Sequence, residues 1–165
     1  MTYQEAKRQT DPAEYGTVVK GSAEAEAAIE RFRDFFRSMS VASVREKTQQ
    51  VYATDAFFND TIKSVKGAEA IEEYLAESLE ATESVVVKIE DIAESRGNYY
   101  FIWHMTIQFK NLNNGRPAES SGMSHIRFDQ AGKIVLHQDY WDAAGGLFEY
   151  IPVVGRLIRY VKGRI

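Results

Sequence analysis

The sequence predicts an α+β fold in which helices come first and an antiparallel sheet follows. Two observations lead to this prediction. Up to about residue 80, apolar residues recur every three or four positions, which is the period of an amphipathic helix. From Ser84 onward the period falls to two, and short turn signals separate the segments, as is typical of consecutive antiparallel strands. Strands and helices do not alternate, so the pattern does not predict a doubly wound parallel sheet.

The composition indicates one compact domain and excludes several kinds of site. A chain of 165 residues with 44% hydrophobic residues can bury a sizeable core. Its net charge of −4 gives no electrostatic reason to expect a nucleic-acid partner. The absence of cysteine excludes disulfides, thiolate metal sites and a cysteine nucleophile. The first residues lack the apolar core of a signal peptide, and no stretch approaches the roughly 20 apolar residues of a membrane span, so we expect a cytoplasmic protein.

The chain is expected to divide into three parts. Residues 1–21 are polar and aperiodic and contain Pro12, so we expect a flexible N-terminal arm. Ser22 is a good helix cap, because its hydroxyl can accept a hydrogen bond from a backbone N–H of the first turn. The α+β domain is expected over 22–145, and a basic amphipathic helix over 146–165.

Within the α+β domain, each expected element depends on the spacing of its apolar residues. Helices are expected over about 23–39, 42–52 and 68–79, with a short aromatic strand over about 54–62. Four further strands are expected over about 85–94, 98–110, 118–129 and 133–141. The turns between these four are short, which implies that neighbouring strands run antiparallel.

The C-terminal helix is predicted from a regular apolar spacing. Its apolar residues lie alternately four and three positions apart, and they are Leu147, Ile151, Val154, Ile158, Val161 and Ile165. The basic residues among them are Arg156, Arg159, Lys162 and Arg164. Pro152 is expected to start the main helix, since proline suits a first helical turn. Three roles stay open for this helix: covering the pocket or a dimer partner, lying on an anionic membrane surface, or packing on its own sheet.

The last predicted strand carries the residues that point most directly to a binding site. Side chains alternate between the two faces of a strand, so His137, Asp139 and Trp141 share one face. A histidine, a carboxylate and an indole on one face suit a pocket of mixed polarity. The alternating aromatic residues of 98–110 would supply a facing apolar wall. The alternative is that these aromatic side chains pack closely together and leave no cavity.

Three stretches of the domain carry motifs of a known family. The first is Ala53-Thr54-Asp55-Ala56-Phe57-Phe58-Asn59-Asp60, followed by Lys66-Gly67-Ala68-Glu69-Ala70-Ile71. The others are Met123-Ser124-His125-Ile126-Arg127-Phe128-Asp129 and His137-Gln138-Asp139-Tyr140-Trp141-Asp142. Together they resemble the nuclear transport factor two-like superfamily, closest to its SnoaL-like polyketide cyclase and ketosteroid isomerase branches. The resemblance implies a cone-shaped barrel, in which a strongly curved antiparallel sheet wraps around the N-terminal helices, and a homodimer.

The resemblance also implies roles for individual residues. Asp60 matches the aspartate that moves the substrate proton in ketosteroid isomerases, and Asp139 matches an aspartate that limonene epoxide hydrolases use. Ser124 stands where the isomerases have the protonated acid of their oxyanion hole, and Phe32 lies near the position of their tyrosine. The arginine and second aspartate of the hydrolases are absent from 102–106. SnoaL-like cyclases, which use an aspartate base in a largely apolar cavity, therefore match this chain better.

Two functions stay open after the sequence analysis. The first is a cofactor-free enzyme that binds a small hydrophobic, cyclic molecule (polyketide- or steroid-like) and transfers a proton, with Asp60, Asp139 and His137 as catalytic residues. Its ligand-binding residues would be Phe32, Tyr52, Phe58, Trp103, Met105, Ser124 and Trp141. The second is a non-catalytic binding or dimeric interaction module, with partner contacts through outward residues such as His104, Met123 and His125. No metal or cofactor is expected for either, since the three histidines show no ligand spacing.

Overall fold

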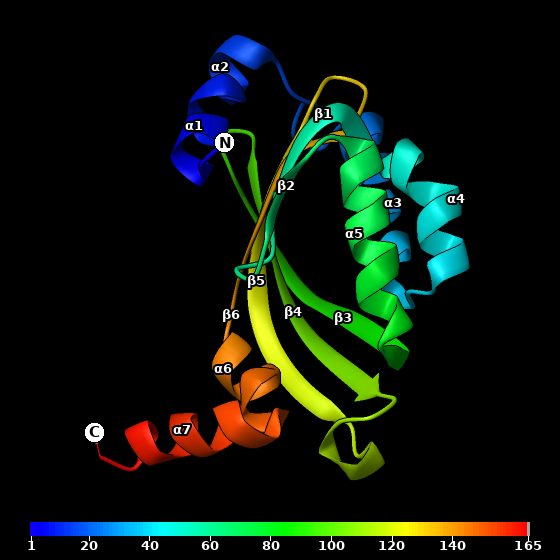
Figure 1. Cartoon of the computed structure of the whole chain (residues 1–165). Helices are drawn as coiled ribbons and strands as arrows, with labels where there is room; N and C mark the ends of the chain where they lie inside the picture. The colour runs from blue at the N-terminus through cyan, green and yellow to red at the C-terminus, as the bar shows by residue number, and fades with distance from the viewer. Residues whose placement is uncertain (165) are drawn as a thin grey trace.

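The computed structural model describes residues 1–164 and contains both predicted halves, so the α+β class is confirmed. Three helices lie on the concave side of the sheet (Figure 1), and they are α3 (Ala23–Arg37), α4 (Val41–Val51) and α5 (Ala68–Glu80). The Ser22 hydroxyl accepts a hydrogen bond from the Ala25 N–H at 3.1 Å and so caps α3 as expected. The helix ends before the predicted residue 39, because the Met39 N–H donates to the Val85 carbonyl oxygen at 3.1 Å instead.

Six strands form one strongly curved sheet that does not close into a complete barrel (Figure 1). They are β1 (Tyr52–Asn59), β2 (Ser64–Lys66), β3 (Thr82–Ser95), β4 (Asn98–Phe109), β5 (Ala118–Phe128) and β6 (Ile134–Trp141), in the order β2-β1-β6-β5-β4-β3. The antiparallel run from β3 to β6 is the predicted meander. The prediction of a purely antiparallel sheet is wrong at one pair, since β1 runs parallel to β6. Four strands and α5 separate β1 from β6 along the chain, and local turn signals say nothing about such a distant pairing.

The helices and the sheet meet in an aromatic core. The buried face of α3 carries Ala25, Ala28, Phe32, Phe35 and Phe36, which follow helical spacing. The centroid of the Phe32 ring lies 4.1 Å from that of Phe101 on β4. Full burial of a side chain of this kind contributes about 1.5–3 kcal/mol to stability. These contacts hold α3 against the concave face of the sheet.

The first 21 residues differ from the expected flexible arm. Tyr3–Gln9 forms helix α1 and Pro12–Tyr15 forms helix α2, both on the side of the sheet opposite α3 (Figure 1). Thr2 and Glu5 form a reciprocal capping box at the start of α1. Ala6 is fully buried in a small apolar cluster whose other buried members are Phe57 and Leu136. The helices are too short to show an apolar period, which is why the sequence analysis missed them.

Two buried side chains of β5 hold α1 in place. The Arg127 guanidinium donates hydrogen bonds to the carbonyl oxygens of Lys7 at 2.6 Å and Thr10 at 2.8 Å, at the C-terminal end of the helix. His125 Nδ1 accepts a hydrogen bond from the Tyr3 hydroxyl at 2.8 Å, and its Nε2 donates to Asn98 Oδ1 at 2.8 Å. His125 was expected to face a dimer partner, but it is only 1% exposed, because the chain's own α1 covers that part of the sheet.

The first prediction concerns the attachment of α1. Replacing Arg127→Met should lower the free energy of unfolding by about 2–3 kcal/mol, because hydrogen bonds to a charged group contribute roughly 1.5–3 kcal/mol. It should also release α1, so that trypsin cleaves faster after Lys7 and Arg8, which limited proteolysis with mass spectrometry would detect. The matched control is Arg96→Met in the exposed β3–β4 turn, which should leave cleavage unchanged. Equal cleavage rates for both variants and the wild type would contradict this account.

The second prediction concerns pH. Burial, and next the nearby Arg127 guanidinium, lower the pKa of the His125 imidazole from its ordinary value of 6.5 to about 4. Between these two values the unfolded chain binds a proton that the folded chain does not, so stability falls as pH drops from about 6.5 to 4. The full difference is on the order of 3 kcal/mol. Urea unfolding of the wild type and of His125→Gln at several pH values tests this: the variant should lose this part of the pH dependence, and identical slopes for both would refute it.

The C-terminal segment extends away from the sheet (Figure 1) and contains α6 (Ala143–Gly146), a 3-10 turn η2 (Phe148–Tyr150) and α7 (Pro152–Lys162). Pro152 occupies the first turn of α7, as predicted. Ile165, the last residue of the predicted apolar series, lies outside the described residues. Within residues 1–164, no helix is both long enough and apolar enough to cross a membrane.

Candidate functional site

A cavity of about 580 Å³ lies between the helices and the concave face of the sheet. The helices line it with Phe32 and Phe36 of α3 and Tyr74 and Leu75 of α5. The sheet lines it with alternate residues of β3 and β4, namely Val85, Val87, Ile89, Trp103, Met105 and Ile107. This volume falls within the range of small-molecule sites, about 300–1,000 Å³. Trp103 and Phe109 of β4 therefore border open space, whereas Phe101 of the same strand packs against Phe32 in the core.

The inward face of β6 brings His137, Asp139 and Trp141 to one end of this cavity, as strand alternation predicts. His137 is 1% exposed and both ring nitrogens are engaged: Nε2 with Asp139 Oδ1 at 2.8 Å and Nδ1 with the Tyr52 hydroxyl at 2.7 Å. Because a carboxylate only accepts hydrogen bonds, Nε2 carries the proton and Nδ1 accepts from Tyr52. Burial, and next the charge of Asp139, raise the pKa of Tyr52 well above 10, so the hydroxyl stays protonated and donates.

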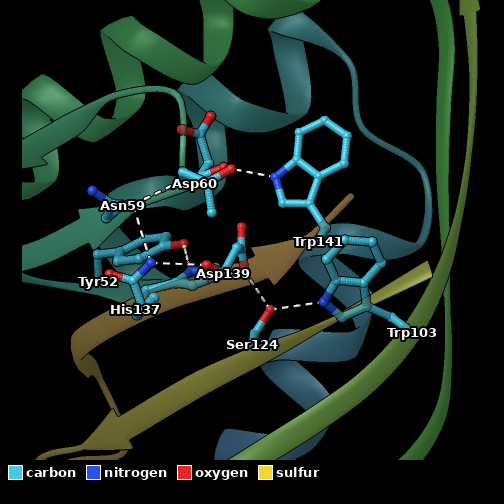
Figure 2. Close-up of polar contacts among 10 residues, drawn as sticks. Tyr52, Asn59, Asp60, Trp103, Ser124, His137, Asp139 and Trp141 are labelled. Carbon is cyan, nitrogen blue, oxygen red and sulfur yellow. Dashed lines mark hydrogen bonds and ion pairs between the residues drawn. The ribbon is translucent and has the colours of Figure 1, made fainter. Parts of the chain in front are cut away.

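Asp139 is held from two sides. Besides the His137 Nε2–H, the Ser124 hydroxyl donates to Asp139 Oδ1 at 2.5 Å, and the Trp103 Nε1–H donates to Ser124 Oγ at 2.9 Å (Figure 2). Both hydrogen bonds to the carboxylate end on Oδ1. Among the described residues, no side chain or backbone donor is hydrogen-bonded to Oδ2, and the side chain is 16% exposed. The carboxylate is thus fixed in orientation with one oxygen available to a molecule in the cavity.

The indole of Trp103 has room because the facing residue on β5 is Gly122. A Cβ atom at this position would lie 2.5 Å from two ring carbons of Trp103 and 2.8 Å from the Cβ of Trp141. Any side chain here would displace one of the two tryptophans. Gly122 therefore permits the hydrogen bond from Trp103 to Ser124, and through it the orientation of Asp139.

Asp60 also lines the cavity, but its carboxylate is engaged differently from that of Asp139. Its Oδ1 accepts from the backbone N–H groups of Ile62 at 2.9 Å and Lys63 at 2.8 Å, and its Oδ2 accepts from the Tyr74 hydroxyl. Burial, and next the hydrogen bond to Asp60, raise the pKa of Tyr74, so Tyr74 stays a donor. The Trp141 Nε1–H donates to the Asp60 backbone oxygen at 2.7 Å (Figure 2). Asp60 thus closes a turn and anchors two aromatic side chains.

Nine of the ten residues predicted for the site line the cavity: Phe32, Phe58, Asp60, Trp103, Met105, Ser124, His137, Asp139 and Trp141. The tenth, Tyr52, lies behind His137 and contacts it through the hydrogen bond, with the two rings nearly parallel and their centroids 6.0 Å apart. The β3 wall was not predicted, although the alternation of Val85, Val87 and Ile89 indicates it. Tyr74 was likewise not predicted for the site, although it lines the cavity. Within the described residues, no group of three or more His, Asp or Glu side chains is arranged to hold a metal ion.

The comparison with protein families decides the family. The model of the SnoaL-like domain matches residues 29–137, which run from within α3 to within β6 and include the site residues up to His137. The chain belongs to the SnoaL-like domain family. The resemblance of its motifs to the nuclear transport factor two-like superfamily is thereby confirmed. No match was found among proteins of curated function.

Solved structures similar to this SnoaL-like chain confirm its fold. A protein from Acidithiobacillus ferrooxidans assigned as a polyketide cyclase is 15% identical, with a TM-score of 0.63 over 86% of this chain and 99% of that one. A hypothetical protein from Catenulispora acidiphila with a ketosteroid isomerase-like fold, in complex with trimethylamine, is 16% identical, with a TM-score of 0.62 over 73% of this chain and 88% of that one. An epoxide hydrolase of M. tuberculosis is 15% identical, with a TM-score of 0.61 over 84% and 98%. At these identities the likeness extends to the fold alone, and the function of the SnoaL-like chain depends on its own site.

Proposed function

We propose that this SnoaL-like protein binds a small hydrophobic, cyclic molecule in the cavity, with Asp139 accepting a proton from it in a cofactor-free isomerisation or cyclisation. The observation that carries the proposal is the combination of an apolar cavity of about 580 Å³ with one oriented carboxylate at its end. Apolar walls favour a ligand that is poorly soluble in water, and a few polar groups at one end fix its orientation.

Asp139 is a better proton acceptor than Asp60 on geometric grounds. A general base must reach the proton that it removes, so one of its oxygens has to be available to the ligand. Asp139 has Oδ2 available, whereas hydrogen-bond donors engage both oxygens of Asp60. In the proposed step, Oδ2 takes a proton from a carbon next to a ligand carbonyl, and the same carboxyl group returns it to another carbon. The ligand is isomerised and Asp139 ends in its original state.

A second candidate is a binding protein that does not convert its ligand. One observation favours it: the indole N–H groups of Trp103 and Trp141 and the hydroxyl of Tyr74 already donate to protein acceptors. An enolate formed in the cavity would need donors aimed at its oxygen, because such donors supply much of the stabilisation in reactions of this kind. Both candidate functions place the ligand in the same cavity, and they differ only in whether the bound ligand is converted.

A homodimer is part of the same proposal and is expected from the family. The outer sheet face near His104 and Met123 is partly exposed and offers a contact surface, whereas His125 lies under α1. Sedimentation velocity of the purified chain would test this, since a monomer at all concentrations would remove the dimer from the proposal.

Ligand binding can be measured directly, because both tryptophans of the chain line the cavity. Tryptophan fluorescence should change on titration with cyclic ketones and polyketide-like aromatics. A phenylalanine at position 87, introduced as Val87→Phe, should fill part of the cavity and weaken binding at least tenfold. The matched control is Val86→Phe, which adds the same ring on the exposed face of β3 and should bind like the wild type. Equal affinities for the two variants would refute a ligand site in the cavity.

A further inference from the structure

Helix α7 presents its apolar face to solvent. At 100° per residue, Val153, Val154, Leu157, Ile158, Tyr160 and Val161 fall on one side of the helix. Five of these six are between 40% and 78% exposed, and the sixth, Ile158, is partly exposed. A surface helix of a globular protein ordinarily turns its apolar side inward. Of the three roles left open by the sequence, packing on its own sheet is therefore excluded for this face.

Contacts on the other side of α7 hold this orientation. Gly155 is buried, and a Cβ atom there would lie 2.0 Å from the Glu149 carbonyl oxygen, so only glycine allows the helix to approach so closely. The Arg159 guanidinium donates to the same carbonyl oxygen at 3.0 Å, and the Lys162 ammonium pairs with the Glu149 carboxylate at 2.5 Å. The polar side of α7 thus faces the preceding turn η2, and the apolar side faces away from it.

The charge of this segment is opposite to that of the chain. The whole chain has a net charge of −4, yet residues 152–165 contain four basic residues and no acidic one. Arg156 lies at one border of the apolar side, where it can reach charged groups beside the surface that the apolar side enters, whereas Lys162 at the other border pairs with Glu149. A second copy of α7 would place like charges against each other, so the charge argues against pairing of two such helices.

We infer that α7 is a docking surface for a membrane rich in anionic lipids, on which it lies in the plane of the headgroups. An amphipathic helix with basic residues on its polar face and aliphatic and aromatic residues on the other has the features of an interfacial helix. The exposed valines, Leu157 and Tyr160 enter the boundary between headgroups and acyl chains, and the basic residues contact lipid phosphates and carboxylates. The segment that leads from the domain to α7 includes Leu147, and this residue lines the cavity.

Vesicle co-sedimentation of the full chain tests the inference. The wild type should pellet with phosphatidylcholine vesicles that contain phosphatidylserine and stay in solution with phosphatidylcholine alone. Replacing Leu157→Glu should abolish pelleting, and Arg156→Gln with Arg164→Gln should weaken it about 30-fold, because each basic residue contributes about 1 kcal/mol at such a surface. The matched control Val86→Glu, on the exposed face of β3, should pellet like the wild type.

Three outcomes would overturn the inference. The first is that the wild type does not pellet with anionic vesicles, and the second is that it pellets equally with neutral ones. The third is that the Leu157→Glu variant pellets with anionic vesicles as much as the wild type does. Sedimentation velocity without vesicles serves as the second measurement. A dimer that dissociates on Leu157→Glu would assign the apolar side to a second copy of the chain instead.

Discussion

Replacing Asp139→Asn is expected to reduce proton transfer by about 10²–10⁴-fold, the usual contribution of a positioned general base. The amide has the size and shape of the carboxylate, and its oxygen can still accept from Ser124 and His137. The amide, unlike the carboxylate, cannot take a proton from the ligand. The fold and the affinity for the ligand should therefore change little while the chemistry is lost.

The readout is exchange of the ligand's carbon-bound hydrogen for deuterium in D₂O, followed by NMR with a cyclic ketone found by fluorescence titration. The proton on Asp139 can exchange with solvent deuterium before it is returned, because this side chain is 16% exposed. The wild type should speed this exchange and Asp139→Asn should not. The matched control is Asp60→Asn, which should retain exchange within a few-fold if that carboxylate only closes a turn. A variant pair in which Asp60→Asn loses exchange and Asp139→Asn keeps it would reverse the assignment. No exchange in the wild type, with clear binding, would favour the non-catalytic candidate.

Replacing His137→Leu is expected to lower the free energy of unfolding by about 3 kcal/mol. The imidazole lies between Tyr52 and Asp139 and is 1% exposed, so its loss leaves the buried Tyr52 hydroxyl without a partner. A buried polar group without a hydrogen bond costs roughly 1–3 kcal/mol, and Asp139 loses one of two donors as well. For a chain of this size the melting temperature should fall by about 6–12 °C.

Thermal and urea unfolding would measure the effect, and a second substitution would locate it. In the His137→Leu background, Tyr52→Phe should restore part of the stability, because it removes the hydroxyl that has lost its partner. In the wild-type background the same substitution should destabilise. Additive effects of the two substitutions would show that the pair is not energetically coupled and would contradict the proposed hydrogen-bond chain.

Strand alternation predicted the parts of the site that lie on β4, β5 and β6. His137, Asp139 and Trp141 are two residues apart on one strand, so a period of two places all three on the inner face wherever the strand begins or ends. The same holds for Trp103 and Met105. The fold class followed from the change of period near residue 82 and from the short turns, both of which are local signals.

Features that depend on distant contacts could not be predicted in the same way. The roles of Asp60 and Asp139 look alike in the sequence, and only the turn at Ile62 and Lys63 and the hydroxyl of Tyr74 distinguish them. Helix α1 is held by Arg127, more than a hundred residues away. An amphipathic pattern predicted α7, but the direction of its apolar side depends on the contact of Gly155 with Glu149.

The central claim is that the cavity holds a small hydrophobic molecule, and native mass spectrometry of the purified protein tests it most directly. The wild type and Val86→Phe should carry an added mass, and denaturation should release a cyclic, oxygenated compound from both. Val87→Phe, which adds the same ring inside the cavity, should carry little or none. Wild-type protein without any added mass, or the same compound bound equally by Val87→Phe, would contradict the claim.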